Sequence, residues 1–255
     1  MPLTVPETVL HRLQSAQRVV ALTGGGLAAE SGVPSFRDAH VGQWAQFDVR
    51  ELATPQAFLR NPRLVWEWYD SRRRAAEQIE PNVAHYALVD LEQYFPHFML
   101  VTQTIDGLHW RAGSRDLLEL NGCLRRSRCF DAGHVFSEWE DVGELPPRCP
   151  HCGGQLRPDV VMFGEGVPEW ELRKARPAVE RCEVFLCLGA VGAIEPVASF
   201  PFVAKRAGAF VLAIDPNPDD SVYAVVADYV VKAPVLEGLP ELARLIIGEG
   251  TAIGE

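Results

Sequence analysis

Residues 18–37 limit the possible folds more than any other part of the chain. They open with a short apolar run, residues 19–22, that is typical of a strand buried on both faces of a parallel sheet. Three glycines follow after one more residue: Gly24, Gly25 and Gly26. Because glycine has no Cβ atom, the chain can turn sharply there, and a phosphate can approach the backbone N–H groups before a helix starts at Leu27. The pattern predicts a strand, a turn and a helix that together cradle a dinucleotide.

The residues after this turn resemble a known family. Residues 30–38 read ESGVPSFRD, which is similar to the cofactor-binding loop of the sirtuin family. The short pattern from Gly24 to Ala29 is weak evidence alone, but so long a match is specific. The resemblance implies an α/β fold, a doubly wound parallel sheet of the sirtuin-like Rossmann type, with NAD as cofactor. It also implies that Phe36 and Arg37 close on the nicotinamide.

Composition narrows the classes of partner. The chain has 255 residues and a formal net charge of −10, which disfavours general binding to nucleic acid or to an anionic membrane. The basic run from Arg72 to Arg74 follows a helical pattern and is interpreted as a solvated helix face. The N-terminus has no signal-peptide pattern, and 6 cysteines without such a signal indicate a reducing compartment. We therefore expect a cytoplasmic protein.

Hydrophobic periodicity predicts the order of the elements. Strands are expected at residues 19–22, 98–102, 117–120, 158–163, 184–188, 210–214 and 229–231, and helices at residues 6–17, 82–95, 196–207 and from residue 236. We expect residues 1–40, 82–122 and 156–255 to form an NAD-binding domain. A helical insert (residues 41–81) and a degenerate zinc ribbon (residues 123–155) are expected to form a small domain. Within the helical insert, Thr54-Pro55 and Asn61-Pro62 each predict a helix start.

Residues 102–109, TQTIDGLH, come at the end of a predicted strand, where ligands meet an open α/β sheet. The segment resembles the sirtuin motif TQNxDxLH. The resemblance implies that Asp106 binds the nicotinamide carboxamide, with Gln103 and Ile105 beside it. Thr104 stands where the family carries an asparagine that holds the ribose. A hydroxyl cannot supply both the donor and the acceptor of an amide, so this contact is altered.

Asn121 is a second departure from the family. It aligns with the histidine of the family's His-Gly motif, which deprotonates a ribose hydroxyl during acyl transfer. An amide does not titrate between pH 5 and 8, so Asn121 can orient a hydroxyl but cannot accept its proton. Loss of such a base typically costs ~10²–10⁴-fold in rate. His109 and His134 are the nearby alternatives in sequence, and each is interpreted first as an ordinary structural histidine.

Further departures remove hydroxyl groups along the expected cofactor path. Ala28 replaces a family serine, and Gly189 and Ala190 open a turn where the family carries hydroxyl residues. Asp215 follows a predicted strand and is expected to reach the adenosine ribose. Arg37, Thr104 and Asn121 are the candidate catalytic residues. The pattern predicts that cofactor binding survives while catalysis is weakened.

The cysteines predict half of a zinc ribbon. Cys149 and Cys152 have the spacing of two ligands for one tetrahedral ion. Cys129 starts a second pair upstream, but Ala132 takes the place of its partner. His134 is an alternative fourth ligand, and a metal-free ribbon remains the other interpretation. Three more cysteines are interpreted as buried structural thiols: Cys123, Cys182 and Cys187.

Residues 156–165, LRPDVVMFGE, resemble the family's LRPxVVxFGE segment. The resemblance implies pairing with an extended acyl-lysine peptide by β-augmentation. The candidate substrate-binding residues are Val160, Val161, Phe163, Gly164 and Glu165. The plain alternative is that the apolar members of this set are buried strand residues.

Two functional hypotheses follow. In the first, the protein is an NAD-dependent lysine deacylase with weak or altered acyl transfer, and an acylated-lysine peptide or protein is its partner. In the second, it is a catalytically silent protein that binds NAD or ADP-ribose and reports it to a partner. The family favours the first and the substituted side chains favour the second. We adopt the first as the working hypothesis.

Overall fold

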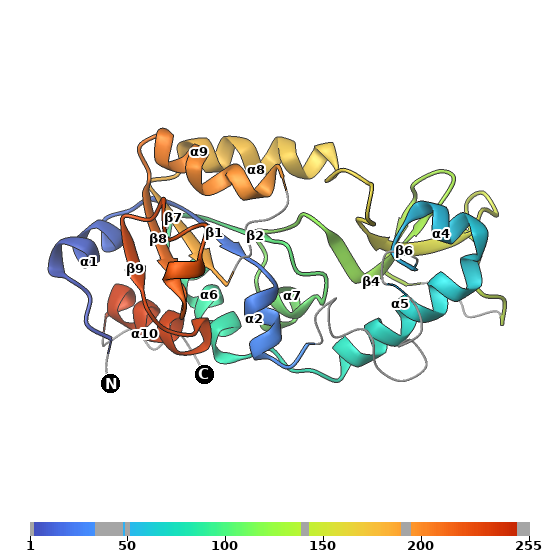
Figure 1. The fold of residues 1–255 in the computed structure, drawn as a ribbon, viewed down its shortest axis with the longest axis horizontal. Coiled ribbons are helices and arrows are strands. Elements are labelled where there is room, and N and C mark those ends of the chain that lie inside the picture. The colour runs from blue at the N-terminus through green and yellow to red at the C-terminus, as the bar shows by residue number, and fades with distance from the viewer. Residues whose placement is uncertain (1–2, 34–47, 49–51, 139–142, 190–194, 249–255) are drawn as a thin grey trace.

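The computed structural model describes residues 3–33, 48, 52–138, 143–189 and 195–248 (Figure 1). Its larger part is a six-stranded parallel sheet with the strand order β3-β2-β1-β7-β8-β9. The strands are β1 (Arg18–Thr23), β2 (His97–Thr102), β3 (Leu117–Glu119), β7 (Val184–Leu188), β8 (Phe210–Ile214) and β9 (Tyr229–Val231). The order runs outward in both directions from β1, which confirms the predicted doubly wound parallel sheet.

Helices cover both faces of this sheet because the side chains of β1 alternate between two cores. Val19 and Ala21 belong to one core, and Val20 and Leu22 belong to the other. The helices that contribute to the first core are α1 (Glu7–Gln14), α2 (Gly25–Glu30), α6 (Val83–Tyr94) and α10 (Val235–Ile247). Those on the second are α8 (Glu169–Arg181), the 3-10 turn η3 (Val197–Ser199) and α9 (Phe200–Arg206). Figure 1 shows α8 and α9 above the sheet, with α6 and α10 below it.

Glu30, at the end of α2, caps a helix that lies 205 residues later. Its two carboxylate oxygens accept hydrogen bonds from the first amides of α10, at 3.1 Å from Val235 N and 2.6 Å from Leu236 N. These N–H groups have no acceptor within their own helix. Pro234 at the N-cap makes no side-chain hydrogen bond to them. The glycine turn and the last helix are therefore tied together through one carboxylate.

A second, smaller module lies at the far end of the molecule (Figure 1). Its antiparallel sheet has the order β5-β4-β6. The strands are β4 (Gly122–Cys129), β5 (Val135–Phe136) and β6 (Leu156–Val160), and the helices packed beside them are α4 (Pro55–Arg60) and α5 (Pro62–Glu77). The remaining short elements of the described chain are α7 (Leu108–Ala112) and the 3-10 turn η4 (Pro218–Asp220).

The two predicted helix starts in the insert are confirmed. Thr54 Oγ1 accepts a hydrogen bond from Ala57 N, and Asn61 Oδ1 accepts one from Leu64 N, each over 3.1 Å. A proline occupies the first turn in both cases, where its missing N–H has no consequence. The sequence pattern therefore placed α4 and α5 correctly.

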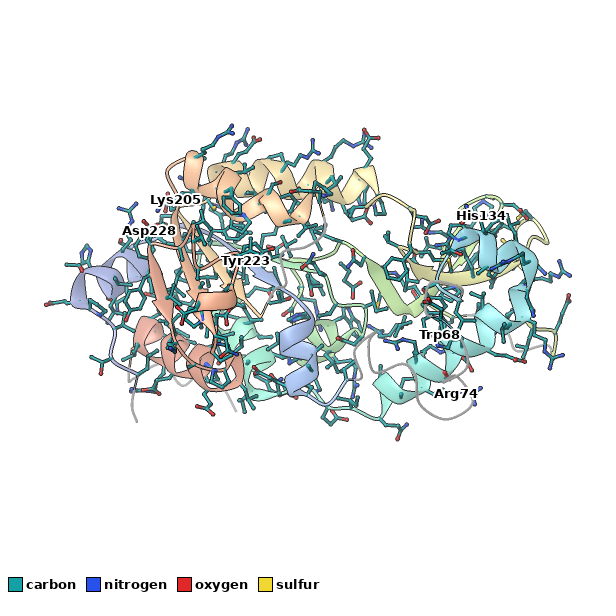
Figure 2. All side chains as sticks on the ribbon, in the orientation of Figure 1. Trp68, Arg74, His134, Lys205, Tyr223 and Asp228 are labelled. Atoms are coloured by element: carbon teal, nitrogen blue, oxygen red, sulfur yellow. The ribbon has the colours of Figure 1, made fainter. Side chains whose placement is uncertain are left out.

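One face of α5 fills the core of the small module. Trp68 and Tyr69 are buried with Phe58 and with Leu124 from β4. The interpretation of the three-arginine run as a solvated face is right only for Arg74, whose side chain is 75% exposed (Figure 2). The guanidinium of Arg72 lies 5.3 Å from the centre of the Trp68 ring. Arg73 is largely buried and pairs with Asp70.

One expectation about the elements is wrong, and one helix was missed. The strand expected at residues 158–163 is β6, which ends at Val160 and pairs antiparallel with β4 in the small sheet. Its buried members include Arg157 and Asp159, which hydrophobic periodicity does not detect. Helix α8 was not expected at all, because it is highly charged and carries Pro177 in its interior. No helix in the described part of the chain is both long and apolar enough to cross a membrane.

Candidate functional site

The segments predicted to bind a cofactor meet at one edge of the parallel sheet. Thr23 at the end of β1 is in register with Thr102 of β2 and with Leu188 of β7, and Leu188 is in register with Ile214 of β8. The loops after these strands therefore begin side by side, at the carboxyl edge where such sheets bind ligands. They carry Gly24, Gly25, Gly26, Gln103, Thr104, Ile105, Asp106, Gly189 and Asp215. Asn121 follows β3, whose Glu119 is in register with Thr102. Phe36, Arg37 and Ala190 lie outside the described residues.

The glycine turn is held by the loop after β7. Gly24 is the N-cap of α2, so two of the three glycines lie within the helix rather than before it. Gly26 N donates a hydrogen bond to the carbonyl oxygen of Gly189 over 3.0 Å. A Cβ atom on Gly26 would lie 2.8 Å from that oxygen, whereas one on Gly25 would have no atom within 4 Å. Gly26 allows two backbones to approach, and Gly25 faces open space.

The turn after β2 places Asp106 in a buried position. Asp106 is 4% exposed, and its Oδ1 accepts a hydrogen bond from Leu108 N over 2.8 Å. Burial raises the pKa of this carboxyl, and the negative charge of Glu119 raises it further. Hydrogen bonds from the Leu108 amide and the Thr104 hydroxyl lower it. The position is therefore tuned by its neighbours and suits a carboxyl group that contacts a ligand.

Thr104 is buried beside other hydroxyl groups. Its Oγ1 lies 3.0 Å from Thr102 Oγ1, and Thr102 Oγ1 accepts a hydrogen bond from Thr23 Oγ1 over 2.8 Å. His109 Nε2 lies 2.8 Å from the same Thr23 oxygen. His109 is 1% exposed, and burial holds its pKa well below the ordinary value, with a smaller contribution from His85. A neutral, enclosed imidazole of this kind is held as part of the core.

Asn121 lies between the two sheets, after β3 and before β4. Its side-chain Nδ2 donates to the backbone carbonyl oxygen of Gln103 over 2.8 Å. The backbone carbonyl oxygen of Asn121 accepts a hydrogen bond from Val161 N over 2.9 Å. Gly122 follows with φ +78°, and a Cβ atom there would lie 2.0 Å from the carbonyl oxygen of Asp159. The side chain of Asn121 is thus fixed by the turn that carries Gln103.

The segment predicted to bind a peptide starts at the end of β6 and continues to Glu165. Val160 closes β6, and Phe163 N donates to the carbonyl oxygen of Ala53 over 2.8 Å. Phe163 is 45% exposed, so the plain interpretation of this run as buried strand is wrong at that residue. Gly164 has φ +90° and nothing within 4 Å of a Cβ position. Both Glu165 carboxylate oxygens pair with Arg157, at 2.7 and 2.6 Å.

A cluster of ion pairs, missed by sequence reasoning, joins the two sheets. Arg126 bonds Glu119 at the end of β3 over 2.6 Å and Asp159 of β6 over 2.8 Å. Arg128 lies 2.9 Å from the other oxygen of Asp159. A cavity of about 160 Å³ opens beside this cluster, and Val160, Val161 and Glu165 contribute to its walls. Charged residues spread over three strands leave no local pattern that would have revealed it.

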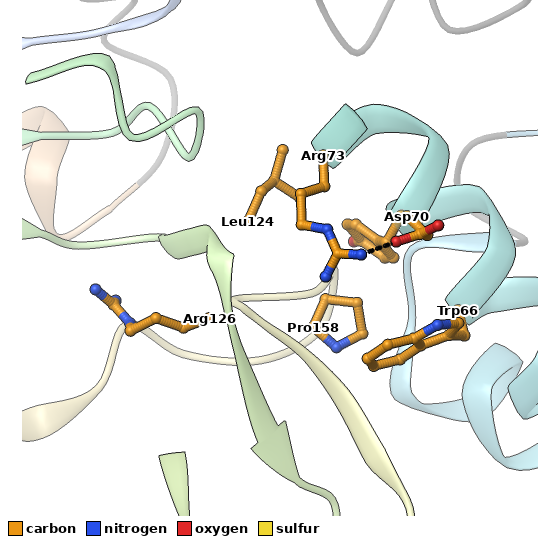
Figure 3. A pocket seen from close by; sticks show the side chains of 7 residues that line it. Trp66, Asp70, Arg73, Leu124, Arg126 and Pro158 are labelled. Carbon is orange, nitrogen blue, oxygen red and sulfur yellow. Dashed lines mark hydrogen bonds and ion pairs between the residues drawn. The ribbon is translucent and has the colours of Figure 1, made fainter. Parts of the chain in front are cut away.

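A narrower pocket lies between α5 and the small sheet (Figure 3). Trp66, Leu124 and Pro158 supply its apolar wall. Asp70 and Arg73 close one side as an ion pair, and the guanidinium of Arg126 points away from it (Figure 3). This pocket is separate from the carboxyl edge of the parallel sheet.

Four ligand atoms converge at the end of the small module. Cys129, His134, Cys149 and Cys152 place their ligand atoms within 4.8 Å of one another. Cys129 Sγ lies 3.4 Å from Cys152 Sγ, and Cys149 Sγ lies 3.4 Å from His134 Nδ1. With Zn–S bonds of about 2.3 Å, two sulfur ligands of a tetrahedral ion stand roughly 3.8 Å apart, so the cluster needs little movement to hold zinc.

The predicted substitute ligand lies beside the three cysteines. His134 places its ligand atom in the position that Ala132 leaves without one, and zinc binding there stays a prediction. The backbone amide of Ala132 instead points at Cys129 Sγ over 3.4 Å, as amides do around metal-bound thiolates. The remaining cysteines, Cys123, Cys182 and Cys187, are buried elsewhere, as expected.

The sequence and the fold match known proteins. The Sir2 family profile matches residues 24–196. The chain is 44% identical over 225 residues to an NAD-dependent protein deacylase of Aquifex aeolicus, covering 88% of this chain and 93% of the relative. It is 43% identical over 244 residues to NAD-dependent protein deacylase 1 of Pseudomonas aeruginosa, covering 92% and 97%.

The fold is also similar to that of solved structures. A crystal structure described as a Sir2 homolog–NAD complex superposes with a TM-score of 0.86 at 38% identity, covering 95% of this chain and 94% of that one. A structure described as Sir2 bound to acetylated peptide gives a TM-score of 0.80 at 25% identity, covering 96% and 98%.

Proposed function

Because the chain belongs to the Sir2 family, we propose that it binds NAD at the carboxyl edge of the parallel sheet and acts as an NAD-dependent protein-lysine deacylase. The relatives described above are named as such enzymes. The residues present fit the cofactor, since open space above Gly25 leaves room for phosphate groups and Asp106 offers a buried carboxyl for an amide. NAD supplies the chemistry, a glycosidic carbon that releases nicotinamide and accepts the acyl oxygen.

Different residues of the chain are assigned to different parts of NAD. We assign Gly24, Gly25 and Gly26, with Gly189 and Ala190, to the phosphates and the nearby ribose. Asp215, whose Oδ1 accepts a hydrogen bond from Asn217 N over 2.8 Å, is assigned to the adenosine ribose. Asp106, with Gln103 and Ile105, is assigned to the nicotinamide amide. Phe36 and Arg37 are assigned to closing over it.

The proposal that acyl transfer is weak rests on the side chain of Asn121. One Nδ2–H donates to the carbonyl oxygen of Gln103, which orients the side chain, and Oδ1 is its acceptor for a ligand hydroxyl. That oxygen accepts a hydrogen bond and orients the hydroxyl, but an amide takes up no proton at neutral pH. The proton must pass to water, which makes the step slow.

We assign the acyl-lysine peptide to the region from Val160 to Glu165. Support comes from the similarity to a structure bound to acetylated peptide and from the cavity of about 160 Å³ beside this segment. Phe163 and Gly164 are exposed there, and an extended peptide could pair beside them. Zinc is assigned to Cys129, His134, Cys149 and Cys152, where it would fix the loops of the small sheet.

The alternative is a silent protein that binds NAD or ADP-ribose. One observation favours it: the amide of Asn121 and the hydroxyl of Thr104 are both engaged by neighbouring residues of the chain itself. Neither is arranged as a proton acceptor. In this case the pocket would hold the nucleotide and the turnover would be absent.

A measurement of nicotinamide release distinguishes the two proposed functions. The protein, loaded with zinc, is incubated with NAD and with a panel of acylated-lysine peptides, and free nicotinamide and deacylated peptide are measured. The proposed function predicts equal, slow formation of both products. Calorimetric heat with NAD but no product above the peptide-free background would favour the silent binder. The absence of both heat and product would overturn the proposal.

A further inference from the structure

Strand β4 interrupts its pairing with β6 part-way along its length. Cys123 lies opposite Asp159, and Ser127 lies opposite the neighbouring residue of β6, Pro158. Residues 124–126 therefore have no partner in β6 and form a bulge. Bulges bend a strand and aim its side chains at other elements, often beside functional sites. In this protein the element beside the bulge is the turn after β2.

The bulge contacts the residues before and after Asp106. Leu124 N donates a hydrogen bond to the carbonyl oxygen of Ile105 over 2.8 Å. Gly107 has φ +78°, and a Cβ atom there would lie 2.6 Å from Cδ of Arg125. The aliphatic stem of Arg125 thus packs directly on the Gly107 backbone. Asp106 is held between a backbone hydrogen bond on one side and this side chain on the other.

The guanidinium of Arg125 extends from Gly107 to helix α7. Its central carbon lies 3.9 Å from the centre of the Trp110 ring, which is a cation–π distance. Among the described residues this guanidinium makes no hydrogen bond or ion pair, so the ring is its partner. Trp110 belongs to the helix that begins at Leu108, and Leu108 N donates to Asp106 Oδ1 over 2.8 Å. Arg125 therefore connects the Asp106 turn to the helix that follows it.

We propose that Arg125 is a positioning residue for Asp106: its stem on Gly107 and its guanidinium on Trp110 together fix the turn that presents the Asp106 carboxyl group to the carboxamide of NAD. The inference deepens the proposed function and rests on it for the identity of the ligand. Because Arg125 contacts Gly107 and Trp110, it acts on the ligand through the turn.

The contact between Arg125 and Trp110 should have a selective effect on ligands. Trp110 is 47% exposed and Arg125 is half-buried, so the pair contributes little to the hydrophobic core. Without this contact the turn samples other arrangements, and the affinity falls with the fraction of molecules in the binding arrangement. The loss concerns the nicotinamide end of NAD. ADP-ribose lacks nicotinamide, so its affinity should not depend on the contact.

Three substitutions separate this contact from general packing. Arg125→Ala removes the stem and the cation, Arg125→Lys keeps both, and Trp110→Leu removes the ring. Arg115→Ala is the matched control. The guanidinium of Arg115 also lies near the Trp110 ring, at 5.3 Å, but its side chain donates to the carbonyl oxygens of Trp110 and Ser114 in its own segment.

Each variant of the full chain is measured in three ways. The affinities for NAD and for ADP-ribose are determined by calorimetry, and folding is followed by the melting temperature. Opening of the turn is followed by hydrogen exchange of the Leu108 amide in the unliganded protein, because this amide bonds Asp106.

We expect Arg125→Ala and Trp110→Leu each to weaken NAD binding roughly 3- to 10-fold, which corresponds to the loss of one cation–π contact. Exchange of the Leu108 amide should accelerate in both variants, and ADP-ribose binding should be nearly unchanged. A double variant should lose no more than either single variant, because both residues act through one contact. Arg125→Lys and Arg115→Ala should behave as the parent protein.

Equal losses of NAD and ADP-ribose affinity in Arg125→Ala would show a general structural role and overturn the proposal. Unchanged NAD affinity in that variant, or an equally large NAD-selective loss in Arg115→Ala, would also overturn it. If Arg125→Ala does not fold, Trp110→Leu decides between the same outcomes. Faster Leu108 exchange in the variants of a protein that binds no NAD would support the role of Arg125 in fixing the turn and overturn the proposed function instead.

Discussion

The amide of Gly26 donates to the carbonyl oxygen of Gly189 over 3.0 Å, which brings the loops after β1 and β7 into backbone contact. A methyl group at position 26 would lie 2.8 Å from that oxygen and 3.1 Å from the Gly189 Cα. Backbone atoms cannot rotate away as a flexible side chain would. We therefore expect Gly26→Ala to lower the free energy of unfolding by about 1–3 kcal/mol, measured by urea denaturation.

Gly25→Ala is the matched control. It lies in the same helix but has nothing within 4 Å of a Cβ position, so its free energy of unfolding should change by less than about 1 kcal/mol. Equal losses in both variants would show that chain flexibility, and not the close approach to Gly189, decides the effect.

The four-ligand cluster predicts one zinc ion per chain, held through His134. We expect His134→Ala to lose the metal during gel filtration and to lower the melting temperature by roughly 5 °C or more, because metal binding stabilises the folded loops. Adding Ala132→Cys to this variant should restore binding, since it completes a second Cys-x-x-Cys pair with Cys129. Metal content is measured by atomic emission.

His151→Ala serves as the control for this experiment. Its ring lies 5.1 Å from that of His134, but His151 is not a member of the ligand cluster. It should retain the metal. Loss of zinc from His151→Ala together with retention in His134→Ala would reassign the fourth ligand.

His85 makes the fold sensitive to acid. Burial lowers its pKa from 6.5 to about 4, so the unfolded chain binds more protons between these two values. Stability is therefore complete above pH 6.5 and declines as the pH falls toward 4. The His85 contribution should cost about 2 kcal/mol between pH 7 and pH 5. It is measured as the difference between the parent protein and His85→Gln in urea unfolding at both values.

His109 has a depressed pKa for the same reason and adds to the decline in both proteins. His11 is exposed on α1, and His11→Gln should follow the parent at each pH. A His85→Gln variant that loses as much stability as the parent would show that the acid sensitivity lies elsewhere.

Asn121→His tests whether a missing proton acceptor limits the proposed deacylation. An imidazole at this position titrates in the neutral range and can take the proton that an amide cannot. We expect deacylation to rise by roughly 10²-fold and its pH profile to gain a limb near about pH 6.5. Rates are measured as deacylated peptide formed under saturating NAD.

Asn121→Ala is the control, because it frees the Gln103 carbonyl without adding a base. It should be no faster than the parent. An equal gain in the alanine variant would mean that the amide obstructs the pocket, and no gain in the histidine variant would place the limitation at another residue.

The parallel sheet was predictable because its central strands are continuous apolar runs. In β1, β7 and β8 nearly every position is buried, and the two insert helices begin with Thr-Pro and Asn-Pro pairs. Strand β4 and helix α8 escaped prediction because both are rich in charge. In β4, Arg126 pairs with Glu119 of β3, and no local pattern records such a pair.

The candidate site was also predictable only in part. The ends of parallel strands must meet, so the locations of Gly24 and Asp106 followed from the strand pattern. The contacts that these residues make with other segments did not follow from that pattern. That Thr23 bonds Thr102, or that Gly26 lies against Gly189, depends on the distance between segments far apart in sequence. His134 was expected as a substitute fourth ligand, but only the loop geometry shows that it lies beside the three cysteines.

The central place of β1 has a consequence for synthesis of the chain. Its partner on one side, β2, begins at His97, but its other partner, β7, begins only at Val184. A nascent chain therefore carries an unsatisfied apolar strand edge while the whole small module is being translated, and such edges recruit other strands. Truncated or stalled products of this gene should be prone to aggregate, whatever the completed protein binds.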